Sequence, residues 1–280
     1  MGTLDTISSG AKVGGYVVDA PIGEGGAGVV YRGHDTAGTP VAIKVLQPRL
    51  VGVEEAQRRF MREISAMGRV QHPNVVRVLA SGMDEGRPFL VTPYYAGGSL
   101  ESRVDARGPF GSETINRLLA EVAGALDALH TAGLVHRDVK PSNVFLAPDG
   151  AAVLGDLGLV RASGASMLTQ AGALLGTLDY LAPEAILGEE PSAAGDVYSL
   201  ACTLYVAATG RPPFTGPNAM AVGVAHLEEP PPDARATRPD LPAVLCAAIL
   251  AGMAKDPAER PAGPGALAAL AGVATSSSPA

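Results

Sequence analysis

The segment 136–143 combines residue types that the transfer of a phosphoryl group requires. Asp138, Lys140 and Asn143 lie within it, and Asp156 follows in an Asp-Leu-Gly sequence. Phosphoryl transfer from ATP needs metal ions that bridge phosphate oxygens, a base at the acceptor hydroxyl, and cations that face the developing charge. We expect Asp138 to accept the hydroxyl proton and Lys140 to steady the transferred phosphate. We expect Asn143 and Asp156 to hold Mg²⁺.

A glycine-rich run near the N-terminus is a second candidate for phosphate binding. Gly23, Gly25 and Gly28 have the G-x-G-x-x-G spacing, in which backbone N–H groups can approach phosphates closely. Alone this signal is weak, because 35 of the 280 residues are glycine and dinucleotide-binding folds share the motif. Those folds need a helix directly after the glycines. Here residues 29–31 are Val-Val-Tyr, which continues as a strand.

Lys44 ends the next apolar run, 41–44, and by default it would be one solvated lysine on an ordinary strand. That interpretation weakens if a carboxylate can face it. Glu63 lies at the edge of the apolar stripe of the helix that follows, so it could pair with Lys44 and hold it against nucleotide phosphates. Glu54 and Glu55 are the alternatives, although carboxylates in a first helical turn are already favoured by the helix dipole.

These residues need a sheet and several helices to position them. Alternating and short apolar runs predict strands and one helix in the first third of the chain, the strands at 16–22, 29–33, 41–46, 75–79 and 89–92 and the helix at 53–70. Apolar periodicity then predicts helices at 115–129, 193–209, 218–227, 241–254 and 265–273. The fold class is therefore α+β, with a small antiparallel sheet and one helix followed by a larger, mostly helical part.

Composition excludes several other classes of protein. The net charge of -7 argues against a surface for nucleic acid, which needs clustered Lys and Arg. Cys202 and Cys246 each lie in an apolar run, which favours buried thiols over a metal site or disulfide. No signal peptide and no run long enough to span a bilayer is evident, so we expect a cytoplasmic location.

Taken together, the motifs resemble those of eukaryotic-like (Hanks-type) serine/threonine protein kinases, most closely the bacterial branch. Further matches in the same order are Asn74, Gly176-Thr177, Ala182-Pro183-Glu184, Asp196 and Arg260. The resemblance covers about residues 14–272 and implies a two-lobed protein kinase fold. Its parts would be a flexible N-terminal segment at 1–13, an N-lobe at 14–93, a C-lobe at 94–272 and a flexible tail at 273–280.

The resemblance implies an enzyme that transfers the ATP γ-phosphate to Ser or Thr hydroxyls of proteins. ATP and Mg²⁺ would be its cofactors, with Mn²⁺ as an alternative cation. Thr92 would be the gatekeeper, and the Pro93 carbonyl and Tyr95 N–H would bond the adenine. The implied nucleotide-binding set is Ile22, Gly23, Gly25, Gly28, Val30, Ala42, Lys44, Thr92, Pro93, Tyr95 and Asn143.

Other implied roles are structural and regulatory. Glu184 and Arg260 would form a buried ion pair, and Asp196 would anchor the backbone of the catalytic loop. Arg137 would bind a phosphate added to the activation segment, for which Thr169 is the preferred site. Thr177 would shape the acceptor site near Asp138 and Lys140.

Three departures from the family pattern leave the chemistry intact. Leu157 stands where phenylalanine is commoner, and Gly195 and Ala201 replace residues that are more often serine and glycine.

The implied partners are protein substrates and, for autophosphorylation, a second copy in a homodimer. The chain would have no nucleic-acid partner and no membrane span, although it could be the cytoplasmic domain of a longer, membrane-anchored kinase.

Two alternatives compete with a protein kinase. A small-molecule phosphotransferase would share the fold, but Lys140, the Ala182-Pro183-Glu184 motif and the long activation segment argue against it. A pseudokinase would normally have lost a catalytic residue. All of the expected ones are present, namely Lys44, Asp138, Asn143 and Asp156.

Overall fold

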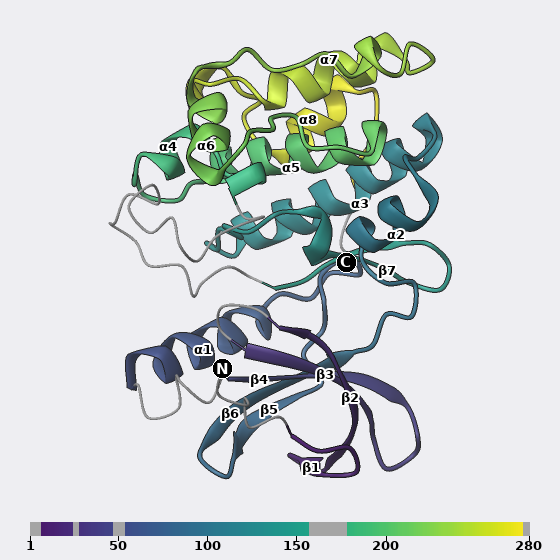
Figure 1. Cartoon of the computed structure of the whole chain (residues 1–280), viewed down its shortest axis with the longest axis vertical. Helices are drawn as coiled ribbons and strands as arrows, with labels where there is room; N and C mark the ends of the chain where they lie inside the picture. Colours follow the sequence, from purple (N-terminus) through teal and green to yellow (C-terminus); the bar gives the residue numbers. More distant parts are fainter. Residues whose placement is uncertain (1–6, 25–27, 47–53, 157–177, 277–280) are drawn as a thin grey trace. The chain divides into compact units, whose positions relative to one another are not determined.

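The computed structural model describes residues 7–24, 28–46, 54–156 and 178–276. The chain divides into two units (Figure 1). The N-terminal unit contains Met1–Gln71 and Val76–Tyr94, and the C-terminal unit contains His72–Val75 and Tyr95–Ala280. The run His72–Val75 therefore belongs to the second unit, although the chain on either side of it belongs to the first.

A six-stranded antiparallel sheet forms most of the N-terminal unit, with strand order β1-β2-β3-β4-β6-β5. Alternate residues of these strands, among them Tyr31, Ile43 and Val91, are buried in its core. Helix α1 packs against β6 and buries Phe60 and Ile64, one turn apart on its apolar stripe. The bounds are β1 Lys12–Val13, β2 Tyr16–Glu24, β3 Gly28–His34, β4 Pro40–Leu46, α1 Glu54–Met67, β5 Ala80–Asp84 and β6 Arg87–Pro93.

One predicted strand is wrong. Residues 75–79 were expected to be extended and paired, but sheet pairing with β6 begins only around Leu79 and Ala80. Val75 and Val76 are buried without joining the six-stranded sheet, and Val75 instead bridges Leu154 in the second unit. The true strand β5 is poor in β-branched residues, so its pairing comes from its neighbour β6 and not from its own propensity.

The C-terminal unit is mainly helical, with one short hairpin, β7 and β8. Helix α5 is buried along almost its whole length, and α3 packs against both α5 and α8 (Figure 1). The bounds are α2 Leu100–Arg107, α3 Ser112–Thr131, β7 Val144–Leu146, β8 Ala152–Leu154, α4 Pro183–Ile186, α5 Ala193–Thr209, α6 Ala219–Glu228, α7 Ala243–Gly252 and α8 Pro264–Leu270.

The five helices predicted for this unit are present, and α2 and α4 were not predicted. Helix α2 begins at a reciprocal capping arrangement, in which Ser99 accepts the backbone N–H of Ser102 and Ser102 accepts that of Ser99. Across the described residues, no helix combines the length and the apolar character needed to cross a bilayer.

Candidate active site

The carboxylate of Asp196, in the first turn of α5, holds the backbone of the loop that follows α3. It accepts the N–H of His136 at 2.8 Å and that of Arg137 at 2.9 Å. Its side chain is only 2% exposed, so the hydrogen bonds must replace the water that a carboxylate loses on burial. The loop is therefore fixed by a charge on a distant helix.

His130 completes this arrangement and was not identified from the sequence. Its Nε2 atom lies 2.8 Å from Asp196 Oδ2, so one carboxylate ties together α3, α5 and the loop. The available signal was weak, because a histidine in the last turn of an apolar-faced helix is usually explained by favourable contact with the helix dipole.

Two non-glycine residues of this region have a left-handed backbone. Arg137 has φ 70° and Asp156 has φ 52°. Such conformations cost on the order of 1–3 kcal/mol each and persist only where surrounding contacts impose them. At Arg137 the hydrogen bond to Asp196 supplies such a contact, and strain of this kind is concentrated at functional sites.

His136 is buried and links the loop to the end of β8. Its Nδ1 accepts the N–H of Asp138 at 3.3 Å, so Nε2 carries the proton and donates to the Gly155 carbonyl at 3.0 Å. Burial lowers the pKa of His136, which keeps the ring in this neutral form. Gly155 in turn donates its N–H to the Asn143 carbonyl at 2.9 Å, which joins both ends of the site.

Asp138, Lys140 and Asn143 converge, as their positions in one loop would allow. Lys140 Nζ lies 3.0 Å from Asp138 Oδ2, and Asn143 Nδ2 donates to the same oxygen at 2.9 Å and to the Asp138 carbonyl at 2.8 Å. The Asp138 and Lys140 side chains are 17% and 19% exposed, so this charged pair is mostly shielded from water. The 3₁₀ turn Pro141–Asn143 brings the asparagine back over the aspartate.

The donor atoms present fit a hard cation such as Mg²⁺. Because Asn143 Nδ2 is directed at Asp138, the amide oxygen Oδ1 is turned away from it. Asp156 follows Gly155, whose two backbone bonds place it beside the same loop. An amide oxygen and a carboxylate are ligands that Mg²⁺ accepts.

Most of the expected nucleotide-binding residues lie on the sheet of the N-terminal unit. Val30 pairs with Lys44, and Ala42 pairs with Thr92. Gly28 has a local reason to be glycine, since a Cβ there would lie 2.6 Å from the Val45 carbonyl oxygen. The others in described strands are Ile22, Gly23 and Pro93.

The remaining predicted residues divide into two groups. Tyr95 belongs to the C-terminal unit, where its ring stacks on Phe145 at 5.8 Å between centroids. Gly25, Thr169 and Thr177 lie outside the described residues, as does the side chain of Glu63.

Comparison with known proteins identifies the family. The protein kinase domain matches residues 16–266. The chain belongs to the protein kinase family. The kinase domain of PknI from Mycobacterium tuberculosis, a solved crystal structure, superimposes with a TM-score of 0.74 at 30% identity, covering 95% of this chain and 99% of that one. The predicted α+β protein kinase fold is confirmed.

Curated relatives narrow the family to bacterial serine/threonine kinases. Serine/threonine-protein kinase PknL of M. tuberculosis is 38% identical over 260 residues, which is 92% of this chain and 65% of PknL. The probable serine/threonine-protein kinase PkwA of Thermomonospora curvata is 37% identical over 250 residues, 89% of this chain and 33% of PkwA. The kinase chain is thus a Hanks-type serine/threonine kinase domain that spans less than two thirds of the length of these relatives.

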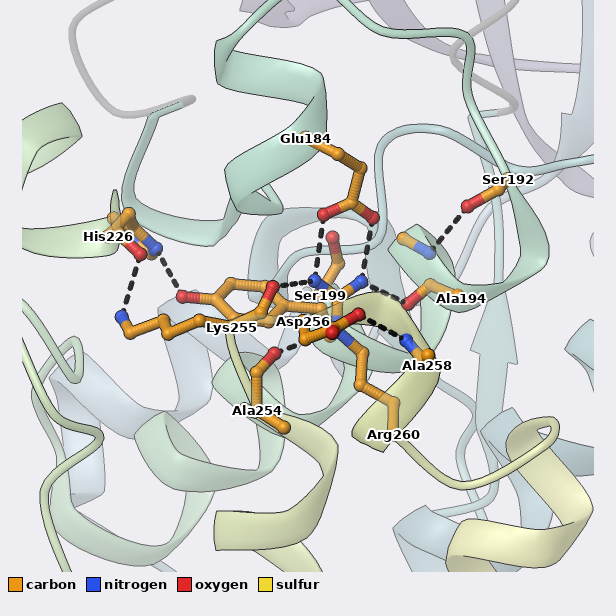
Figure 2. A network of polar contacts seen from close by, with 12 residues as sticks. Glu184, Ser192, Ala194, Ser199, His226, Ala254, Lys255, Asp256, Ala258 and Arg260 are labelled. Atoms are coloured by element: carbon orange, nitrogen blue, oxygen red, sulfur yellow. Dashed lines mark hydrogen bonds and ion pairs between the residues drawn. The ribbon is translucent and has the colours of Figure 1, made fainter. Parts of the chain in front are cut away.

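A second buried charge lies further into the C-terminal unit of the kinase. Arg260 and Glu184 form a two-bond ion pair, with both N···O distances 2.7 Å (Figure 2). The remaining guanidinium N–H groups donate to the carbonyls of Ala254, Ala194 and Lys255. All five donors of Arg260 are therefore used, which compensates the burial of a side chain with no exposed surface.

A histidine is buried beside this ion pair. His226 Nδ1 lies 2.8 Å from the Tyr198 hydroxyl, and the Arg260 guanidinium stacks over the Tyr198 ring. Lys255 Nζ donates to the His226 carbonyl at 2.7 Å (Figure 2). The same ammonium lies 4.1 Å from the Phe214 ring centre. Burial, and next the positive charge of Lys255, lower the pKa of His226 to about 3. Burial also lowers the pKa of Lys255 to about 8.

We predict that Arg260→Met lowers the free energy of unfolding by about 3–5 kcal/mol, because it leaves the Glu184 carboxylate buried and unpaired. Urea unfolding measures this. The double variant Glu184→Met/Arg260→Met removes both charges and should be less destabilised than the sum of the two single variants. A loss below about 1 kcal/mol in Arg260→Met, or strict additivity, would contradict the prediction.

Acid should destabilise the domain through His226. Its pKa is lower in the folded chain than the ordinary value of 6.5, so between pH 6.5 and 3 the unfolded chain binds more protons. Stability from this group is complete above pH 6.5 and is lost as the pH falls, by on the order of 5 kcal/mol in all. His136 acts in the same direction. His226→Gln should therefore show a smaller loss between pH 7.5 and 5 in urea unfolding, and an unchanged loss would count against this assignment.

Proposed function

We propose that this domain transfers the ATP γ-phosphate to Ser and Thr hydroxyls of proteins, with Asp138 as the base. The observation that carries the proposal is the convergence of Lys140 and Asn143 on Asp138, in a loop whose backbone Asp196 fixes. A base must be positioned before it can act, and here its carboxylate is oriented by one cation and one amide.

Lys140 and Asp138 would have different roles at the acceptor hydroxyl. The carboxylate accepts the proton of the incoming hydroxyl, and the ammonium 3.0 Å away steadies the transferred phosphoryl group. In the serine/threonine kinases that the chain resembles, a lysine two residues after the base accompanies Ser and Thr acceptors. Protein substrates bearing these residues are the proposed partners.

Asn143 and Asp156 would hold Mg²⁺, with Mn²⁺ as a substitute. The bound cation supplies neutralisation of the charge that develops on the phosphate oxygens. On the N-terminal unit, Lys44, paired with Glu63, would bind the phosphates, while the hinge from Thr92 to Tyr95 would hold the adenine. The proposed location of the reaction is the cytoplasm, where ATP is available.

We also propose control by phosphorylation between copies of the kinase. Arg137 is the receiving cation, because its backbone is fixed in the catalytic loop. Thr169 is the proposed acceptor and Thr177 would shape the substrate site. A phosphate would add about -1.5 to -2 charges for Arg137 to bind.

The enzyme assignment predicts that Asp138→Asn loses at least about a hundredfold of the transfer rate, since the amide cannot accept the proton. The assay is incubation with labelled ATP and Mg²⁺ and a generic basic protein as acceptor. Asp149→Asn, an exposed aspartate of the β7–β8 turn, is the matched control and should keep full activity. Label that persists in Asp138→Asn, or appears in no variant, would sink the proposal.

The regulatory proposal predicts phosphate on Thr169 after incubation of the wild-type kinase with Mg²⁺ and ATP. Mass spectrometry of the peptide that spans residues 163–177 measures the occupancy. Asp138→Asn treated in the same way should carry none. Absence of phosphate between residues 163 and 169 in the wild type would show the proposal to be wrong.

A further inference from the structure

The chain after α8 returns to α3 and is held there by Ser276. Its N–H donates to the Ala120 carbonyl at 3.3 Å, and its hydroxyl donates to Asn74 Oδ1 at 2.9 Å. Its carbonyl lies 3.3 Å from His72 Nε2. Every polar group of Ser276 therefore has a partner. The Ser- and Thr-rich sequence around it contains no pattern that predicts these contacts.

Helix α3 carries a glycine where this segment passes. Gly124 is in the middle of α3, a position where glycine costs about 0.5–1 kcal/mol relative to alanine. A Cβ at Gly124 would lie 2.4 Å from the carbonyl oxygen of Ser276 and 2.7 Å from its hydroxyl, and its three nearest atoms all belong to Ser276. The missing side chain is what makes room for the segment 273–276.

The other side of this contact is the loop His72–Val75. Asn74 N–H donates to His72 Nδ1 at 3.2 Å, so Nδ1 is the acceptor and the N–H on Nε2 faces the Ser276 carbonyl. Asn74 Nδ2 donates to the Ala152 carbonyl at 2.8 Å. The Asn74 carbonyl accepts the N–H of Leu154 at 2.8 Å. Asn74 thus uses opposite ends of its amide to join Ser276 to β8.

Strand β8 leads directly into the candidate active site. Glu121 of α3 accepts the Ala152 N–H at 2.7 Å, so both backbone polar groups of Ala152 are bound. After Leu154 comes Gly155, which bonds His136 and Asn143, and then Asp156. The position of Asp156 therefore depends on how firmly β8 is held.

We propose that Ser276 is a positioning residue, and that the segment 273–276 latches the loop His72–Val75 to α3 and thereby steadies β8 and Asp156. The metal-binding role of Asp156 is taken from the proposed function. Release of this latch would free Asn74 Oδ1 from its donor and loosen the strand that carries the metal ligand, without altering any residue of the catalytic loop.

Two substitutions release the latch from opposite sides. Ser276→Ala removes the hydroxyl that bonds Asn74, and Gly124→Ala introduces a methyl group where Ser276 lies. Without nucleotide, hydrogen exchange at the Leu154 N–H should become about fivefold or more faster in both, as expected for loss of a typical hydrogen bond. Gly124→Ala should do this while favouring α3 through its higher helix propensity. Amides of α5 serve as the internal reference and should not change.

The control is Gly111→Ala at the N-cap of the same helix, where a new Cβ meets no atom within 4 Å. It should leave exchange at Leu154 unchanged. Unchanged exchange in Ser276→Ala overturns the proposal, as does faster exchange in Gly111→Ala. If Gly124→Ala does not fold, Ser276→Ala decides alone, because it removes a single hydroxyl from a partly exposed residue.

The second readout is the Mg²⁺ concentration for half-maximal phosphorylation of the basic acceptor protein. Ser276→Ala should raise it about threefold to tenfold with little change in the rate at saturating Mg²⁺, since one hydrogen bond is lost. An altered exchange rate with an unaltered Mg²⁺ requirement overturns the positioning role. If the wild type transfers no label while exchange still responds, the proposed function has failed and the latch on β8 has not.

Discussion

The buried carboxylate of Asp196 is the constraint on which the candidate site depends. A negative charge with 2% of its side chain exposed is tolerated only if donors surround it, and the donors here are two backbone N–H groups and a histidine. Because two donors come from consecutive peptides of the loop, satisfying the charge and shaping the loop are the same event. The helix α5 that carries Asp196 is itself buried, so this anchor cannot easily move.

Arg260 is a buried positive charge in the same unit, whereas Asp196 is a buried negative one. Its guanidinium is neutralised by Glu184 and its remaining donors are taken by carbonyls near the ends of neighbouring elements. Two of those carbonyls, at Ala254 and Lys255, lie in the irregular segment after α7, so the charge also holds a segment that has no regular structure of its own. Each of the two buried charges thus joins segments that are far apart in the sequence.

The sequence predicted the helices whose apolar residues recur at a regular spacing. It also predicted the site residues that lie together in one short segment. Apolar periodicity located α3 and α5 closely. Asp138, Lys140 and Asn143 lie close together because the loop that carries them is short. The incorrect strand at 75–79 shows the limit, since Val75 belongs to the C-terminal unit and bridges Leu154 there, 79 residues further along the chain. His130 and Ser276 act only through residues far along the chain, at Asp196 and Asn74, and local patterns contain no such information.

The left-handed backbone of Arg137 has a consequence for any attempt to transplant the loop. The conformation is one that an arginine does not prefer, and a carboxylate contributed by a helix 59 residues further along the chain holds it there. A short graft of residues 136–143 onto another scaffold would keep every side chain named in the chemistry and would relax to a different shape. The smallest portable unit is therefore the loop together with α5, and its side chains alone do not define it.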